Sequence, residues 1–86
     1  MDLGQSVKDQ ERFDLLFDIV QQKAALELSL SVGRGMAPLS IAWGSSVGET
    51  CSIVNDLDAF RSLPVSVMAE RVMKRIRAWK AAANSN

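Results

Sequence analysis

The 86-residue chain has no histidine and no tyrosine, and it has only one cysteine, Cys51. Without histidine the chain lacks the commonest general base, the commonest metal ligand and the side chain that titrates near neutral pH. One cysteine cannot form an intramolecular disulfide, which small secreted domains usually need. We therefore expect a cytoplasmic protein that is not an enzyme and that has no catalytic, cofactor-binding or metal-binding residues.

Long apolar runs are also missing, because no stretch approaches the roughly 18 apolar residues that span a bilayer, and the first residues do not resemble a signal peptide. Ten basic and ten acidic residues cancel, which argues against strong attraction of the whole molecule to an anionic membrane or to nucleic acid. A chain of this length has room for one hydrophobic core. We expect a single domain over residues 1–86, with frayed ends at 1–5 and 84–86.

Apolar residues at helical spacing predict a first helix over residues 6–24. They fall at i, i+3, i+4, i+7 and i+11, namely Phe13, Leu16, Phe17, Val20 and Ala24. Ser6 is the expected N-cap, since its hydroxyl can accept a hydrogen bond from a first-turn N–H. Leu15 and Ile19 widen the apolar side beyond what one packing surface needs, so both are candidate partner-binding residues.

Residues 25–32 carry a pattern with two readings. Leucine or valine alternates with polar residues from Leu26 to Val32, and such alternation predicts a strand with one buried face. Leucine also favours helices, so a continuation of the first helix to a glycine cap at Gly33 remains the alternative. We favour the strand.

A glycine-containing turn and two further strands are predicted next. The segment Gly33–Gly35 predicts a turn, which would place Arg34 at its tip, in solvent, as a candidate contact residue. Residues 39–44 and 49–54 alternate in hydrophobicity and predict the second and third strands. Cys51 lies in the last of these strands and is expected to be a buried structural residue.

The C-terminal third predicts two helices. Asp56 and Asp58 are expected to cap a short helical turn, and Pro64 suits the start of a longer helix. Apolar residues then follow at spacings of three and four through Val65, Met68, Val72, Ile76, Trp79 and Ala83. This periodic stripe predicts a long amphipathic helix whose apolar side is core.

Charge is segregated along the chain. Residues 1–60 hold nine acidic and four basic side chains, whereas residues 61–86 hold one acidic and six basic. Five of the cations lie in one ten-residue stretch of the last helix: Arg71, Lys74, Arg75, Arg77 and Lys80. Such a cluster can contact phosphates or an acidic protein partner. The reading we favour is that it pairs with the acidic first helix, through Asp9, Asp14 and Asp18.

These observations together predict an α+β fold with an N-terminal helix, a small three-stranded antiparallel sheet, and a long C-terminal helix packed on one face of the sheet. Apolar surface in excess of the core commonly marks a partner surface. We expect a non-enzymatic protein-binding module that docks on a macromolecular partner as a homodimer, acting as a small adaptor, inhibitor or regulatory factor. Phage-encoded inhibitors and secretion chaperones have this size. The alternative is a nucleic-acid-binding regulator that uses the basic helix.

Overall fold

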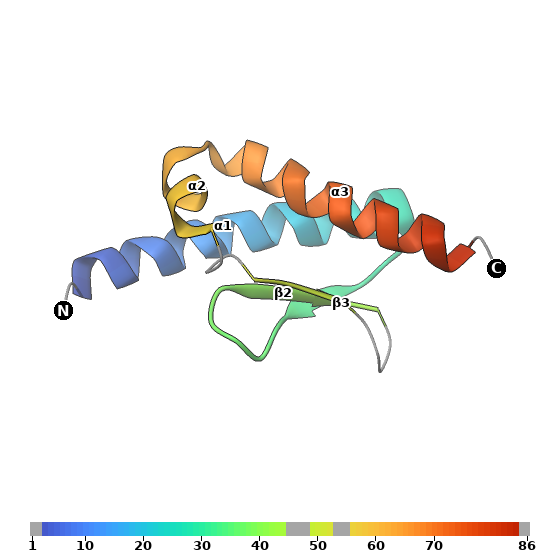
Figure 1. The fold of residues 1–86 in the computed structure, drawn as a ribbon, viewed down its shortest axis with the longest axis horizontal. Helices are drawn as coiled ribbons and strands as arrows, with labels where there is room; N and C mark the ends of the chain where they lie inside the picture. The colour runs from blue at the N-terminus through green and yellow to red at the C-terminus, as the bar shows by residue number, and fades with distance from the viewer. Residues whose placement is uncertain (1–2, 45–48, 53–55, 85–86) are drawn as a thin grey trace.

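The computed structural model describes residues 3–44, 49–52 and 56–84. Its elements in chain order are α1 (Leu3–Leu28), β1 (Val32–Arg34), β2 (Ser40–Trp43), β3 (Glu49–Ser52), α2 (Leu57–Ser62) and α3 (Val65–Asn84). Helices α1 and α3 lie side by side and run in the same direction, and the sheet lies beneath them (Figure 1). The predicted α+β class, with an N-terminal helix, an antiparallel sheet and a long C-terminal helix, is confirmed.

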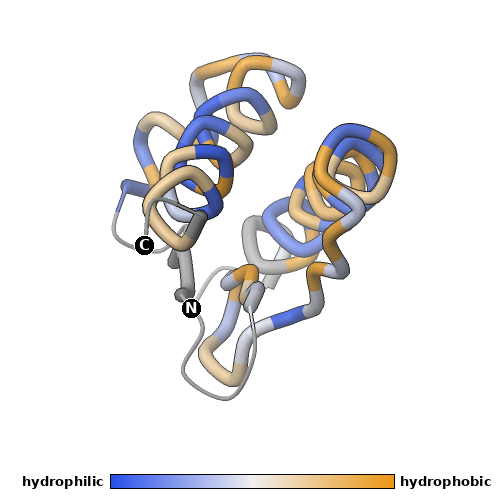
Figure 2. The backbone as a smooth tube through the Cα atoms, turned by 90° about the vertical axis from the view of Figure 1, so that its right-hand side faces the viewer, coloured by the Kyte–Doolittle hydropathy of each residue, from blue (hydrophilic) through white to orange (hydrophobic). Residues whose placement is uncertain are grey.

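The helix layer covers one face of the sheet. The strand order is β1-β2-β3 and both neighbouring pairs are antiparallel. Val32 is the register partner of Trp43, and Ile41 lies two residues before Trp43 on the same strand. Because side chains alternate between the faces of a strand, these three residues share the face that meets the helices, and all three are buried. Viewed along the helices, the two coils lie above the strands (Figure 2).

The core fills the space between the two layers, and the predicted stripe of the last helix supplies much of it. Met68, Val72 and Ile76 are buried, as predicted, whereas Trp79 is half-buried and Ala83 is exposed. The buried apolar residues are Phe13, Leu16, Val20, Ala24, Val32, Ile41, Trp43, Phe60, Met68, Ala69, Val72, Met73 and Ile76. Burial of this set is the main favourable contribution to folding.

The first helix is longer at both ends than predicted, and the strand predicted at residues 25–32 is wrong except at Val32, where β1 begins. Ser6, the predicted N-cap, lies inside α1, which continues to Leu28. Leucine, alanine and glutamate are strong helix formers, and they favour this continuation. Ser29 then takes a positive φ of 51° and the backbone N–H of Leu30 donates to the Ala24 carbonyl at 3.2 Å, which closes the helix.

The turn predicted at Gly33–Gly35 is displaced toward the C-terminus, because Gly33 and Arg34 belong to β1. The Gly35 N–H donates to the Ser40 carbonyl at 2.9 Å, and the Ser40 hydroxyl donates to the Ala37 carbonyl at 2.6 Å. A Cβ on Gly35 would lie 2.2 Å from Ser40 Oγ. The turn therefore requires glycine where the chain passes this side chain.

The predictions for the second half of the chain mostly hold where the structure describes them. Asp56 is the N-cap of α2 and accepts a hydrogen bond from the Ala59 N–H at 3.4 Å, as predicted. The Met68 N–H donates to the Pro64 carbonyl at 3.1 Å, so α3 starts beside the proline. Cys51 lies in β3, but the burial predicted for its side chain lies outside the described residues. The predicted strand end at residues 53–54 also lies outside them.

Candidate functional site

A network of polar contacts joins the first turns of α1 to α2. Asp9 is only 7% exposed, and its carboxylate accepts two hydrogen bonds from the Arg61 guanidinium, at 3.2 and 2.7 Å. One turn along α1, the Arg12 Nε donates to the Phe60 carbonyl at 2.6 Å, and the guanidinium lies 5.7 Å from the Phe60 ring centroid. These contacts fix the junction of α1 and α2.

A depression of about 360 Å³ lies along this junction. Its lining consists of two apolar side chains and five charged ones, namely Leu15, Val65, Lys8, Asp9, Glu11, Arg12 and Arg61. Leu15 is 62% exposed at its edge. Ile19, the other apolar candidate on α1, is half-buried and packs against the core, so only part of its side chain is available to a partner.

Leu26 is an exposed apolar residue that the sequence prediction placed in a strand. It is 87% exposed on α1. Its spacing of seven residues from Ile19 and eleven from Leu15 puts all three on one side of the helix. We call Leu15, Ile19 and Leu26 the leucine face of α1. The spacing is a signal that could have revealed this face once residues 25–28 were assigned to the helix.

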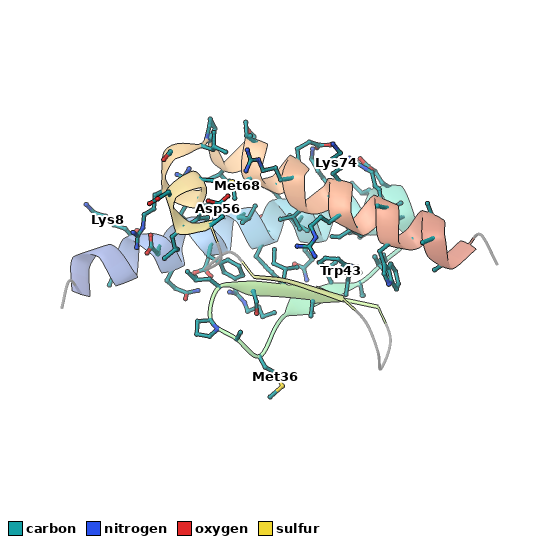
Figure 3. The ribbon with its side chains drawn as sticks, viewed as in Figure 1. Lys8, Met36, Trp43, Asp56, Met68 and Lys74 are labelled. Atoms are coloured by element: carbon teal, nitrogen blue, oxygen red, sulfur yellow. The ribbon has the colours of Figure 1, made fainter. Side chains whose placement is uncertain are left out.

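Arg34 lies against α1 and is not at the tip of a turn, which corrects the prediction. Its guanidinium lies 2.9 Å from the Asp14 carboxylate and 4.6 Å from the centroid of the Phe17 ring. Hydrogen bonds from Gln10 and then from Arg34 lower the pKa of Asp14. At the tip, the fully exposed side chain is that of Met36, which points away from the body of the protein (Figure 3).

The five cations of α3 do not form one surface. Arg77 faces α1, where its Nε lies 3.0 Å from Glu27. Its Nη1 lies 2.6 Å from Glu70, two turns earlier on α3. Lys23 extends the cluster, with its Nζ 3.5 Å from Glu70. Hydrogen bonds from Arg77 lower the pKa of both glutamates, and the same bonds raise the pKa of Arg77. Arg77 is thus a link between the two long helices.

Intramolecular pairing therefore occurs, but not with the predicted partners. Asp9 forms an ion pair with Arg61 of α2, and Asp14 forms one with Arg34 of β1. Asp18 is hydrogen bonded to Gln22 at 3.2 Å. The predicted partners of the α3 cations were wrong because the side of α1 that faces Arg77 carries Glu27 and Lys23.

Three of the five cations remain on the exposed side of α3. Arg71, Lys74 and Arg75 are exposed, whereas Lys80 is half-buried. Arg71 reaches Asp56 at 3.9 Å, a distance at which an exposed ion pair contributes little. Lys74 has no ion-pair partner within the described ranges, and it lies on the outer side of α3 (Figure 3).

A second depression lies between β2 and the C-terminal half of α3. It has a volume of about 370 Å³ and is lined by Trp43, Arg75, Ala78, Trp79 and Ala82. Trp43 is 4% exposed, and its Nε1–H has no hydrogen-bond partner among the described residues. Leaving such a donor unsatisfied costs about 1–3 kcal/mol.

Comparison with known proteins adds no relationship. No protein-family model matches the chain, and no similar protein is found among curated proteins or among solved structures. Among the described residues, no three or more cysteine, aspartate or glutamate side chains gather as metal ligands would. No helix in the described ranges combines the length and apolar character that crossing a membrane demands.

Proposed function

We propose that the protein is a non-enzymatic protein-binding module, acting as a small adaptor, inhibitor or regulatory factor. The leucine face of α1 is the observation that supports this function. Single exposed apolar residues are normal on a protein surface, but Leu15, Ile19 and Leu26 share one side of a long helix. Apolar anchors at such spacing are typical of recognition between helices.

Charge beside the leucine face indicates the chemistry of the partner. Glu11, Asp14 and Asp18 follow one another at spacings of three and four residues and are all exposed. Asp14 is paired with Arg34, so Glu11 and Asp18 supply the net negative charge of this acidic flank along one side of the leucine face. A partner helix with apolar residues on one side and lysine or arginine beside them would match both features.

A second copy of the chain matches this surface less well. Two copies of α1 that pair antiparallel through their leucine faces place equivalent flanks together, so acidic residues would meet acidic residues. Like charges placed together at an interface are unfavourable. The proposal therefore commits to a basic amphipathic helix of another protein, and the homodimer becomes an outcome of the test.

A designed helical peptide tests the proposal. It carries leucines at i, i+4, i+7 and i+11 with lysines on one flank, and a second peptide has glutamates in place of the lysines. We expect the full-length protein to bind the lysine peptide, and to bind the glutamate peptide at least about tenfold more weakly. Fluorescence anisotropy of labelled peptides measures both affinities.

Variants of the leucine face locate the binding. Leu15→Glu should weaken peptide binding by at least about tenfold, a loss of about 1.4 kcal/mol. Met36→Glu changes a fully exposed apolar residue elsewhere and should leave the affinity unchanged. Equal binding by both variants would remove the leucine face from the proposal. Sedimentation of the free protein would favour the homodimer if it gave a dimer mass that Leu15→Glu converts to a monomer mass.

Nucleic-acid binding is the second candidate function. The exposed residues Arg71, Lys74 and Arg75 favour it, since cations on one helix can neutralise phosphates. It ranks below protein binding because Arg77 is paired with two glutamates and Lys80 is half-buried. Three cations leave a small electrostatic footprint for a nucleic-acid-binding protein.

A further inference from the structure

The outer side of α3 carries positive charge that protein binding through the leucine face does not use. Val67, Arg71, Lys74 and Ala78 fall at i, i+4, i+7 and i+11 and are all exposed, so they share one side of the helix. We call these four residues the basic side of α3. Lys74 forms no ion pair within the described ranges, and Arg71 reaches Asp56 only at 3.9 Å. Both cations are therefore available to an acidic surface.

The leucine face of α1 and its flank offer a surface of the opposite charge. Glu11, Leu15 and Asp18 fall at i, i+4 and i+7 and are exposed, so the two carboxylates lie beside Leu15. The basic side of α3 repeats this arrangement with two cations beside Val67, which is 41% exposed. Each surface combines an exposed apolar residue with two charges of one sign, and the two signs are complementary.

These two surfaces cannot meet within one molecule. Helices α1 and α3 already lie side by side (Figure 1), and Arg77 of α3 faces α1, with its Nε 3.0 Å from Glu27. Lys74 lies on the outer side of α3, away from this contact (Figure 3). Contact between the basic side of α3 and the leucine face of α1 therefore requires a second copy of the chain.

We propose that the basic side of α3 docks on the leucine face of α1 in a second copy, with its two cations against Glu11 and Asp18. The inference rests on the proposed function, because it places a second copy on the same surface when the partner protein is absent. Each copy uses two different surfaces, so the contact is head-to-tail and can continue beyond two copies. Pairing of two leucine faces about a two-fold axis would instead stop at a dimer.

Sedimentation equilibrium of the full-length protein tests the association. Exposed ion pairs each contribute little, so we expect a dissociation constant of about 0.1–1 mM. The weight-average mass should then exceed that of a dimer at a protein concentration of about 1 mM. It should fall when salt rises from about 20 to about 300 mM, because salt screens exposed charges. A monomer mass at every concentration up to about 1 mM, or a mass that levels off at a dimer, would overturn the inference.

A charge swap locates the contact. Lys74→Glu alters only the basic side of α3, and Asp18→Lys alters only the flank of the leucine face. Each variant alone should associate at least about threefold more weakly than the parent. An equimolar mixture should recover the parent's association, because each variant offers the other a surface of opposite charge.

Asp58→Lys is the matched control for Asp18→Lys. It reverses an exposed charge on α2 with the same change in net charge and should leave the association unchanged. Circular dichroism checks that each variant folds, and Glu11→Lys replaces Asp18→Lys if the latter does not. A mixture that associates no better than the separate variants would overturn the inference.

The designed lysine peptide separates this inference from the proposed function. At saturation the peptide should cover the leucine face and reduce the protein to a single copy with bound peptide. Peptide binding by a protein that is monomeric at about 1 mM would overturn the inference and leave the proposed function intact. Association that the mixture of variants recovers, without any binding of the peptide, would support the inference and contradict the proposed function.

Discussion

The Asp9 carboxylate on α1 accepts hydrogen bonds from Nε and Nη2 of Arg61 on α2, at 3.2 and 2.7 Å. This bidentate geometry holds the short helix against the long one at a point where Asp9 is almost inaccessible to solvent. Arg61 itself remains partly exposed. The pair is thus a structural element that also borders the depression beside Leu15.

We predict that Asp9→Asn destabilises the fold. The amide has the shape of the carboxylate but no charge, and it cannot accept both hydrogen bonds. A loss of about 1–3 kcal/mol in the free energy of unfolding is expected, measured by urea denaturation. Asp18→Asn is the matched control on the exposed side of α1 and should change stability by no more than about 0.5 kcal/mol. Equal losses in the two variants would contradict a structural role for the Asp9–Arg61 pair.

The Arg77 cluster predicts how stability depends on pH. Hydrogen bonds from Arg77 hold the pKa of Glu27 and Glu70 below the ordinary value of 4.5. As pH falls, the glutamates of the unfolded chain are protonated first, which favours unfolding. The stability from these pairs is therefore present above about pH 4.5 and is lost as pH falls through the lower pKa values of the folded protein.

Thermal melting between pH 7 and pH 3 measures this effect. Glu27→Gln removes one pair, so its difference in Tm from the parent should be largest near neutral pH and should shrink below about pH 4.5. Glu11→Gln removes an exposed glutamate that has no ion pair within the described ranges, and its Tm difference should not show this dependence. A constant difference for Glu27→Gln across the pH range would show that the pair adds no stability.

Sustained helical periodicity and local helix caps made part of the fold predictable from sequence. On α3, Met68, Val72 and Ile76 recur at every fourth residue. This spacing is typical of an α-helix that buries one side. Asp56 was predictable because an N-cap depends on only the next three residues. The helical period also identified Leu15 as an apolar residue beyond those that the core needs.

Features that depend on tertiary contacts could not be predicted. Leu26, Leu28 and Leu30 fit a strand with one buried face, but they also fit the end of a helix, and a run this short cannot distinguish the two. Arg34 lies on the Phe17 ring only because β1 packs beside α1, a contact that no local pattern encodes. Likewise, the five α3 cations form one cluster in sequence, but the helical period turns Arg77 toward Glu27.

We predict that Ser29→Gly stabilises the protein. Ser29 has a φ of 51° at the end of α1, a conformation that costs most side chains about 1–2 kcal/mol and costs glycine almost nothing. Glycine loses about 0.5–1 kcal/mol through the greater freedom of the unfolded chain, which leaves a net gain of about 0.5–1 kcal/mol. Ser31→Gly, at an exposed position without a positive φ, should instead destabilise. Destabilisation by both variants would contradict the strain at Ser29.

The exposed cations Arg71, Lys74 and Arg75 give a quantitative prediction for nucleic-acid binding. Three cations neutralise at most about three phosphates, so log affinity for duplex DNA should fall by no more than about 2.7 per log unit of salt. We expect the dissociation constant to stay in the non-specific range of about 10⁻⁴–10⁻⁶ M at physiological salt, because the acidic flank of α1 repels the same backbone. Anisotropy of labelled DNA at two salt concentrations measures both quantities.

Alanine variants decide between the two candidate functions. Replacing Arg71 and Arg75 together should lower the salt slope by up to about 1.8, since each phosphate contact contributes about 0.9. Lys8→Ala removes an exposed cation from α1 and should leave the slope unchanged. Sequence-selective binding in the nanomolar range, lost in the double variant while its melting transition is retained, would make the protein a nucleic-acid-binding regulator and would displace protein binding as the preferred function.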